Sequence, residues 1–267
     1  MWIDTHCHLD AHEFGDQSLA LAAQAQARGV AMVVIPAVDR ANFAVVRELA
    51  HKAPNASYAL GIHPIYVPHA VEEDLIAMRS AVEEAMADPR FVALGEIGLD
   101  FFIPMLCEPE MREKQVFFLR EQLKIARDFE LPVLCHVRKS QDQVLKHVRQ
   151  IAPAGGIAHA FNGSFQQAQA YIEAGFKLGF GGNLTFTRAL QIRRLAAELP
   201  LSSIVVETDA PDIAPSWLHP GVNTPAEVAG IGEALAELRS DAPGCVAKAT
   251  TRNALDVMPR LRALMAA

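Results

Sequence analysis

Short apolar runs alternate along this chain with longer segments whose apolar residues recur every three or four positions. The longer segments have the spacing of amphipathic helices. In residues 111–129 the recurring positions are Val116, Leu119, Leu123 and Ala126. The short runs are typical of β-strands. They cover residues 2–6, 31–36, 58–63, 91–96, 133–136, 156–159, 177–181 and 203–207.

Eight strands separated by helices predict parallel β–α–β units. A single (β/α)8 TIM barrel, an α/β fold of about 250 residues, accounts for both the strand number and the chain length. The first strand is not followed by G-x-G-x-x-G, which disfavours an open dinucleotide-binding sheet. Neither a change of composition nor a low-complexity linker interrupts the 267 residues. We therefore expect one barrel domain over residues 1–267.

Composition narrows the class of protein. With 51% hydrophobic and 21% charged residues, the chain is well able to bury a core. The longest apolar run, residues 30–38, includes a proline and is far shorter than the roughly 18 residues of a membrane-spanning helix. Acidic residues occupy the start of the chain, where a signal peptide would be basic and then apolar. We expect a cytoplasmic protein without a membrane partner.

The four cysteines form no CxxC pair and no dense pattern, which predicts reduced thiols. Cys7 and Cys135 lie beside histidines, and we expect both to be small buried apolar residues. The net charge of −7 argues against a broad nucleic-acid footprint, because such surfaces are usually basic. It leaves room for a narrow site where metal ions supply the positive charge.

Candidate chemistry begins at residues 3–8, where His6 and His8 are two positions apart. Side chains at this spacing on a strand point to the same side, so the two imidazoles can meet at one point. In a TIM barrel, reactive groups gather where the strands end. Six of the eight predicted strands end at or near a metal-ligand or acid–base residue: His6 and His8, His63, Glu96, His136, His159 and Asp209.

Taken singly, each of these residues is equally compatible with a core histidine, a helix cap or a salt bridge. Their shared position favours a metal site, and a set of nitrogen and oxygen donors suits Mg²⁺, Mn²⁺ or Zn²⁺. A catalytic zinc usually takes three protein ligands and a water. Two ions, about 3.5–4 Å apart, therefore account better for six ligands. Those ligands are His6, His8, Glu96, His136, His159 and Asp209, with Glu96 as the expected bridge because it lies between the two histidine pairs in strand order.

Several blocks resemble the signature motifs of TatD-type metal-dependent hydrolases, the TatD DNase family. The blocks are IDTHCH at 3–8, GIHP at 61–64, GEIGLD at 95–100, LPVLCHVR at 131–138, HAFNG at 159–163 and ETDAP at 207–211. The resemblance extends to the region of Asn253, and residues 181–185 and 210–212 are most similar to the YjjV branch of the family. Three places depart from the common pattern: Val137, Asn162 and residues 223–225.

The resemblance implies a TIM barrel, two divalent metal ions and hydrolysis of phosphodiesters, typically trimming of single-stranded DNA from its 3′ end. It implies that one ion is held by His6, His8, Glu96 and Asp209, and the other by Glu96, His136 and His159. The departures lie beside these ligands, so they affect the expected substrate preference more than metal binding.

We assign catalytic roles to Glu96, to Asp209, which would orient the attacking water and accept its proton, and to His63. His63 would contact substrate or leaving group; a loop histidine before Pro64 is the alternative. Candidate substrate contacts are Asn162, Arg138 and Arg188, since Arg can fork onto phosphate oxygens; Arg188 is equally compatible with a solvated surface residue. Asp4 and Asp100 are candidates to orient the ligand histidines.

The expected partner is an end of single-stranded DNA or another phosphodiester, bound by a monomer. Trp217, Phe101 and Phe102 could stack one or two terminal bases. The same metal chemistry could instead attack a carbonyl ester or amide, for example an aminoacyl-RNA ester. A deaminase is disfavoured because it usually pairs one metal with a separate acid. A non-catalytic barrel that uses metal for stability is the remaining alternative.

Overall fold

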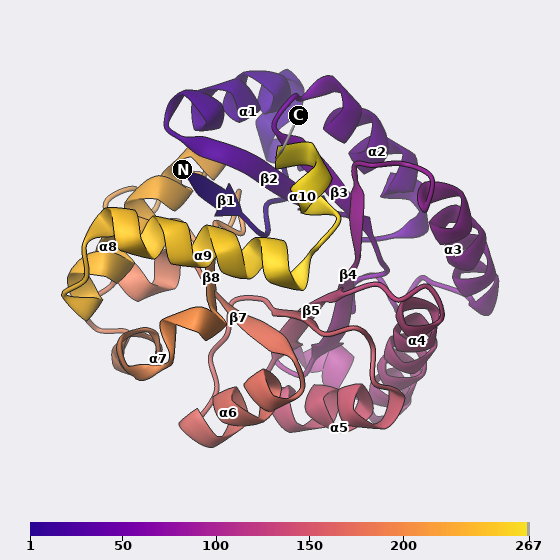
Figure 1. Cartoon of the computed structure of the whole chain (residues 1–267). Coiled ribbons are helices and arrows are strands. Elements are labelled where there is room, and N and C mark those ends of the chain that lie inside the picture. The colour runs from indigo at the N-terminus through magenta and orange to yellow at the C-terminus, as the bar shows by residue number, and fades with distance from the viewer. Residues whose placement is uncertain (266–267) are drawn as a thin grey trace.

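Eight parallel strands form one sheet in the order of the sequence, each followed by helical segments, in the computed structural model, which describes residues 1–265 (Figure 1). This confirms the (β/α)8 barrel. The strands are β1 (Trp2–Asp4), β2 (Val30–Pro36), β3 (Ala56–Leu60), β4 (Phe91–Asp100), β5 (Val133–Arg138), β6 (Gly156–Ala158), β7 (Phe176–Phe180) and β8 (Ile204–Val206).

Helices surround the barrel and cover one of its ends. Its α-helices are α1 (Ser18–Ala27), α2 (Phe43–Lys52), α3 (Glu72–Ala85), α4 (Pro109–Asp128), α5 (Gln141–Ile151), α6 (Phe165–Glu173), α7 (Leu190–Glu198), α8 (Val228–Arg239), α9 (Pro243–Val257) and α10 (Leu261–Met265). Short 3-10 turns are η1 (His12–Gln17), η2 (Arg40–Asn42), η3 (Pro104–Cys107), η4 (Gly182–Thr185), η5 (Leu201–Ser203) and η6 (Pro225–Glu227). Within residues 1–265, no helix is long and apolar enough to cross a membrane.

The first and last strands meet through their backbones and bring the two ends of the sheet together. The backbone N–H and the hydroxyl of Thr5 both donate to the carbonyl of Val206, at 3.2 and 3.1 Å. Just beyond, the Asp209 N–H donates to the carbonyl of His6 at 2.8 Å. Residues that are about 200 positions apart in the sequence thus become neighbours, and Asp209 is carried to the side of His6.

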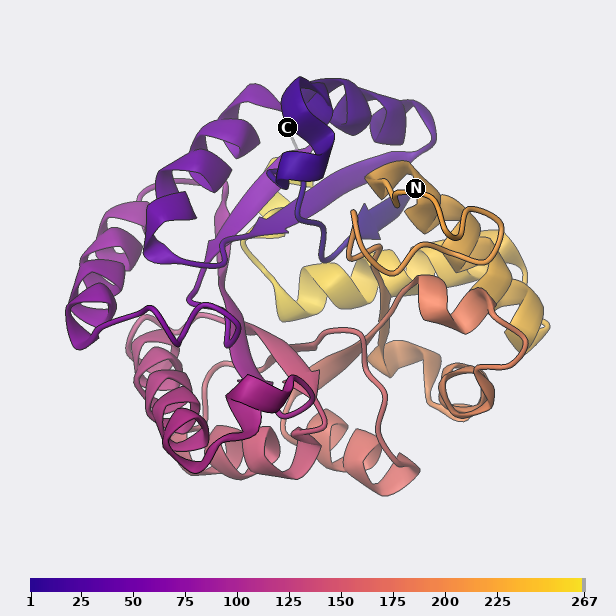
Figure 2. The same cartoon turned by 180° about the vertical axis from the view of Figure 1, so that it is seen from behind.

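One end of the barrel is closed and the other carries the loops that follow the strands. Helices α9 and α10 lie across the closed end, in front in Figure 1. There Val257, Met258 and Leu261 pack with interior residues such as Ile3 and Met32. Figure 2 shows the opposite end, where the strands lead into loops and short turns. Functional groups are expected at this end of a TIM barrel.

Strand boundaries differ from the sequence prediction where they matter for the site. The hydrogen-bonded strands β1, β3, β6 and β8 are shorter than predicted, so His6, His8, His63, His159 and Asp209 lie just beyond them. Strand β4 is longer: it was expected to end at Glu96 and runs to Asp100. Pairing with β5 shifts between Leu94 and Ile97, which leaves room for one extra residue. Such a bulge can turn a side chain toward a site, and here it contains Glu96.

Helix α4 closely matches its predicted range. It begins with Pro109, a residue that suits the first turn because its missing N–H would have no partner there. The predicted apolar positions Leu119, Leu123 and Ala126 are buried against the barrel. Cys7 and Cys135 are fully buried, as expected. The four cysteines form no disulfide within the described residues.

Candidate metal centre

The six predicted ligands meet at the open end of the barrel, with Glu96 at their centre. One carboxylate oxygen of Glu96, Oε2, lies 3.1 Å from Nε2 of His6 and 3.3 Å from Nε2 of His8. The other, Oε1, lies 2.9 Å from Nδ1 of His136 and 3.9 Å from Nε2 of His159. The two oxygens of this buried carboxylate therefore face different pairs of histidines.

Asp209 completes the arrangement from the β8 side. Its Oδ1 lies 3.7 Å from Nε2 of His6 and 3.8 Å from Nε2 of His8, while its Oδ2 lies 3.6 Å from Nε2 of His159. The ring nitrogens of His6 and His8 are themselves only 3.3 Å apart. Imidazoles and carboxylates converge here with little room for solvent.

Two carboxylates behind the site fix the orientation of two histidines. Asp100 Oδ2 lies 3.0 Å from Nε2 of His136, which leaves Nδ1 of that ring to face the centre. Glu207 Oε1 lies 3.0 Å from Nδ1 of His159, which leaves Nε2 of that ring to face the centre. Metal-binding histidines usually have such partners on their outer nitrogen. Asp100 was predicted for this role; Glu207 was missed.

Glu207 could have been recognised from its spacing. It lies two positions before Asp209, as His6 lies two positions before His8. The structure makes room for it at Gly179 of β7, because a Cβ on that glycine would lie 2.5 Å from Cδ of Glu207. The backbone N–H of Ala160 donates to the same Oε1 at 2.6 Å. The Ala160 N–H and the space at Gly179 thus position Glu207, which in turn orients His159.

Asp4 takes a different position from the one predicted. Its carboxylate accepts hydrogen bonds from the backbone N–H of His6 at 3.3 Å and from the N–H and hydroxyl of Thr208 at 2.9 and 2.6 Å. It therefore contacts the backbone at His6 and not the imidazole. Asp4 joins the segment after β1 to the segment after β8 and so sets the distance between His6 and Asp209.

Two buried glutamines on α4 hold segments that sequence reasoning did not connect with the site. The side chain of Gln122 accepts from the N–H of Ile62 at 2.7 Å and donates to its carbonyl at 3.1 Å. Gln115 accepts from the N–H of Asp100 at 2.9 Å. These bonds position the residues next to His63 and the carboxylate behind His136.

His63 lies directly against the candidate ligands, whereas a residue of the outer mouth would lie farther from them. Its Nε2 is 3.1 Å from Nδ1 of His136 and 3.3 Å from Oε1 of Glu96. The backbone N–H of Ile65 donates to Nδ1 of His63 at 3.1 Å. In the neutral ring this bond leaves the hydrogen on Nε2, pointing to the centre of the site. Burial, opposed by Glu96, lowers the pKa of His63 to about 4, so the ring is neutral at physiological pH.

The pKa values of the other candidate ligands are shifted in different directions. Burial raises the pKa of the Glu96 carboxyl, but the surrounding histidines outweigh it and hold that pKa well below its usual range. For His8 and His159, burial is outweighed by facing carboxylates, which raise the pKa to about 9 and about 10. Burial and the nearby His159 lower the pKa of His6. The carboxylates thus stabilise positive charge within this buried space.

Three overlapping groups have ligand atoms within 4.8 Å of one another: His6, His8 and Asp209; His6, Glu96 and His159; and His63, Glu96 and His136. This donor set fits divalent cations, because a buried carboxylate needs a compensating charge and the donors are those of Mg²⁺, Mn²⁺ and Zn²⁺ sites. His159 groups with His6 and not with His136. The division of ligands that the resemblance implies stays a prediction, as does the exclusion of His63 from the ligands.

The predicted substrate contacts lie around the opening. Arg138 is exposed, with its guanidinium 4.0 Å from the ring centre of Phe102 and 3.8 Å from Oδ2 of Asp100. Asn162 is exposed in the loop after β6, and Arg188 is exposed in the loop after η4, 5.5 Å from the ring centre of Phe186. Trp217 is half exposed, and its indole N–H donates to Glu227 at 2.7 Å. Arg138 and the stacking candidate Phe102 both contact Asp100, which itself touches the predicted ligand His136; the Phe102 N–H donates to Asp100 Oδ1 at 2.8 Å.

Comparison with known proteins agrees with this geometry. The family described as TatD related DNase matches residues 3–259. The chain is 39% identical over 254 residues to the Escherichia coli K12 protein called uncharacterized metal-dependent hydrolase YjjV, covering 94% of this chain and 95% of that one. An uncharacterized metal-dependent hydrolase of Haemophilus influenzae is 34% identical over 260 residues, covering 96% of this chain and 98% of the relative.

The crystal structure of YjjV, a TatD homolog from Escherichia coli K12, superposes with a TM-score of 0.90 at 35% sequence identity. The match covers 97% of this chain and 98% of that one, so the same barrel extends over both proteins. The sequence resemblance to this branch is confirmed. The chain belongs to the TatD family and is a metal-dependent hydrolase.

Proposed function

We propose that this hydrolase cleaves phosphodiester bonds at the 3′ end of single-stranded DNA, using two divalent cations. The proposal rests on the way in which the two carboxylate oxygens of Glu96 face different histidines: Oε2 faces His6 and His8, while Oε1 faces His136. A carboxylate between two sets of nitrogen donors is suited to bridge two cations. The family description, TatD related DNase, supports the choice of substrate.

The residues that would hold the cations are those predicted from sequence. His6, His8 and Asp209 with one oxygen of Glu96 would hold the first, and the ligands of the second would be Glu96, His136 and His159. Mg²⁺, Mn²⁺ and Zn²⁺ all suit these donors. When bound, two such ions lower the pKa of a water molecule and neutralise charge on phosphoryl oxygens.

The side chains of the chain itself would move the protons. Asp209 is the least buried of the carboxylates that face the histidines, with a side chain 15% exposed, so it can reach a water at the opening and accept its proton. The neutral His63 would donate a hydrogen bond from its Nε2–H to the leaving oxygen, because Ile65 occupies its other nitrogen. A positioned general base typically contributes about 10²–10⁴-fold to the rate.

Substrate orientation would come from the rim. Arg138 lies beside Asp100 and is placed to fork onto a phosphate just outside the ligand shell. Phe102, beneath Arg138, offers a ring for stacking of a terminal base. Asn162 and Arg188 would complete the contacts from the β6 and β7 sides. Phosphate contacts would then lie on the β5, β6 and β7 sides of the opening.

The test is digestion of 3′- and 5′-labelled single-stranded DNA in the presence of Mg²⁺ or Mn²⁺. Shortening from the 3′ end by the wild type, lost in Glu96→Gln and Asp209→Ala, is expected. Glu198→Gln on the surface of α7 is the matched control, because its side chain is about half exposed and pairs only with Arg194 among the described residues. Hydrolysis of p-nitrophenyl acetate without any cleavage of DNA or bis(p-nitrophenyl) phosphate would instead support the carbonyl-ester alternative.

A further inference from the structure

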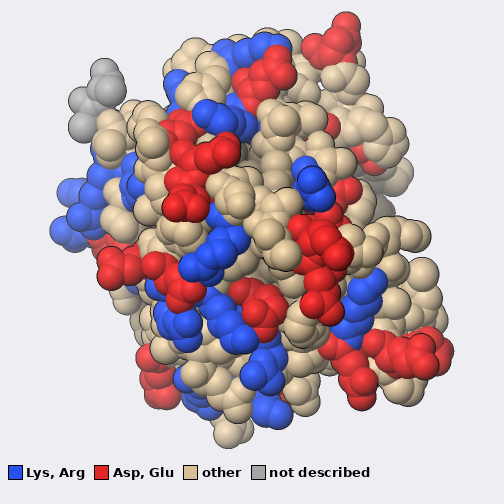
Figure 3. All heavy atoms as spheres, turned by 90° about the vertical axis from the view of Figure 1, so that its right-hand side faces the viewer, with Lys and Arg blue, Asp and Glu red and all other residues tan. Residues whose placement is uncertain are grey.

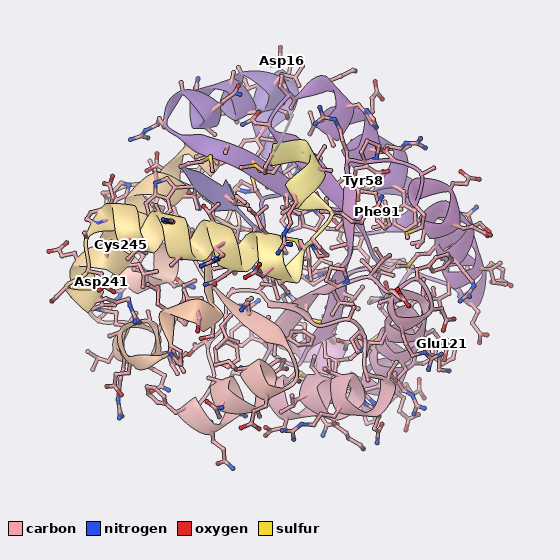
Figure 4. The ribbon with its side chains drawn as sticks, viewed as in Figure 1. Asp16, Tyr58, Phe91, Glu121, Asp241 and Cys245 are labelled. Carbon is pink, nitrogen blue, oxygen red and sulfur yellow. The ribbon has the colours of Figure 1, made fainter. Side chains whose placement is uncertain are left out.

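A second hollow lies beside the catalytic opening, on the outer side of the barrel between α4 and the start of α5. It has a volume of about 750 Å³. We call it the α4–α5 groove. The lining residues used below are Phe101, Arg112, Phe117, Arg120 and Lys139. Helix α4 faces outward here, and Figure 4 labels Glu121 on it.

The groove begins next to the residues that contact the candidate ligands. Phe101, at its near end, follows Asp100 directly, and Asp100 holds His136. The N–H of Phe101 donates to the carbonyl of Arg138 at 2.9 Å, and Lys139 follows Arg138 in the chain. A molecule that leaves the opening past Arg138 therefore enters the groove without crossing another element of the rim.

The cations of the groove form no salt bridge among the described residues, although two of them lie over aromatic rings: Arg112 is 4.4 Å from the ring centre of Phe101, and Lys139 is 4.9 Å from that of Phe102. Within residues 1–265, no carboxylate oxygen lies within 4.0 Å of the charged nitrogens of Arg112, Arg120 or Lys139, and all three residues are exposed. The groove also contains carboxylates: Glu121 pairs with Lys124 at 2.6 Å, whereas Asp142 accepts from the neutral amide of Gln167 at 2.9 Å and keeps its negative charge. Glu113 also lines the groove. Figure 3 shows Lys and Arg gathered low on this side of the molecule, at the height of α4.

The opposite side of the opening is acidic. Asp10, Glu13 and Asp39 face Tyr66, whose pKa is raised by burial and by these carboxylates. A polyanion is therefore repelled from the β1–β2 side, whereas the β4–β5 side offers cations that its phosphates can contact. In a chain with a net charge of −7, three unpaired cations beside the opening favour a polyanionic ligand.

We propose that the α4–α5 groove binds the single-stranded nucleic acid that continues away from the cleaved end, with phosphates on Arg112, Arg120 and Lys139. Phe117, about 38% exposed on the outer face of α4, offers a ring to one base. This inference rests on the proposed function, and it adds a direction: the nucleic-acid chain leaves the site over β4 and β5. It predicts that affinity increases with the length of the oligonucleotide.

The experiment measures binding of fluorescein-labelled oligothymidylates of two, four, eight and twelve nucleotides by fluorescence anisotropy, with Ca²⁺ as the divalent cation and a gel to check their length afterwards. The test variant is Arg112→Ala, Arg120→Ala and Lys139→Ala combined. The control combines Lys52→Ala, Arg194→Ala and Arg262→Ala, which removes the same charge from exposed side chains on α2, α7 and α10.

The wild type and the control should bind the dodecamer at least tenfold more tightly than the dimer, and the test variant should lose that gain. The salt dependence should fall with it, because three phosphate contacts on a single strand contribute a log–log slope of about 2. Arg112 Nε also donates to the Cys107 carbonyl at 2.9 Å. If the triple variant is unstable, the double variant Arg120→Ala with Lys139→Ala tests the same point. Its slope of log affinity against log salt concentration should be smaller in magnitude by about 1.4.

Two results would overturn the inference: an unchanged length dependence in the variant, or equally tight binding of polyglutamate of the same charge, which would identify a site for acidic peptides. Hydrolysis of bis(p-nitrophenyl) phosphate by the wild type is measured in parallel. Hydrolysis with length-independent binding refutes the groove alone. Length-dependent binding that the variant loses, without hydrolysis of any phosphodiester, supports the groove and refutes the proposed function.

Discussion

Gly179 offers a sharp test of how the site is supported, because it touches no candidate ligand itself. Replacing it with alanine would put a Cβ 2.5 Å from Cδ and 2.7 Å from Oε1 of Glu207, where ordinary contacts begin at 3.4 Å. Oε2 of Glu207 would lie closer still to the added Cβ, so the carboxylate must move by more than about 0.9 Å. Glu207 is fully buried, so the movement disturbs its bonds with His159 and Ala160.

The size of the effect follows from those two bonds. N–H···O hydrogen bonds seldom exceed about 3.2 Å, whereas the bond from His159 is already 3.0 Å long. Loss of one hydrogen bond to a charged group costs about 1.5–3 kcal/mol, and overpacking typically costs about 1–3 kcal/mol. We expect the two costs together to lower the free energy of unfolding by about 2.5–6 kcal/mol. Metal affinity should fall about 10–100-fold, as when an outer partner of a ligand is lost.

The assay combines thermal unfolding with a Mn²⁺ titration, and Gly244→Ala is the matched control. A Cβ on Gly244, in the first turn of α9, meets no atom within 4 Å, so this variant should bind Mn²⁺ like the wild type and unfold at the same or a higher temperature. A Gly179→Ala protein that is folded and binds Mn²⁺ with wild-type affinity would refute the role of Glu207 in holding His159.

Three further predictions follow from the described contacts. His63→Ala should lower kcat about 10²–10³-fold, as when one hydrogen-bond donor to the developing charge is removed, with unchanged metal content by atomic spectroscopy; loss of an ion would identify His63 as a ligand. Chelation should lower the Tm, because cations at 100 times Kd stabilise by about 2.7 kcal/mol; an unchanged Tm would contradict a folded-state metal site. Burial raises the pKa of Asp88, but hydrogen bonds led by that from His51 outweigh it, so the pKa is lowered from 3.8. Asp88→Asn should therefore lower the stability at pH 7 by roughly 1–2 kcal/mol, seen as a lower Tm. The difference should shrink as the pH falls below 3.8 and disappear once the pH is below the lowered pKa of folded Asp88; a difference that does not shrink would refute the assignment.

The barrel could be predicted from sequence because its signal is local. Each strand is an apolar run and each helix has its own periodicity, so β–α alternation can be counted without knowing which residues touch. Neighbouring strands bring their side chains together: Tyr58 on β3 and Phe91 on β4, both labelled in Figure 4, have ring centres 5.5 Å apart. The strand ends were less accurate, because hydrogen bonding stops or continues according to neighbours. Strand β4 runs beyond Glu96 because β5 pairs with it again after the bulge.

The candidate ligands could also be found from sequence, because a TIM barrel brings strand ends to one place. The supporting residues could not. Gln122 reaches Ile62, 60 positions away, and Asp4 reaches Thr208, 204 positions away. Nothing in their local sequence distinguishes them from surface or cap residues. The α4–α5 groove was hidden for a related reason, since Arg112 and Lys139 come together only when α4 packs beside the end of β5.

The most direct test of the central claim is the number of Mn²⁺ ions bound per chain at saturation, measured by equilibrium dialysis and atomic spectroscopy. Two ions per chain are predicted for the wild type and for the Glu198→Gln control, and at most one for Glu96→Gln, because both sites share that carboxylate. A single ion in the wild type, or two ions retained without the Glu96 carboxylate, would contradict the bridged two-metal account.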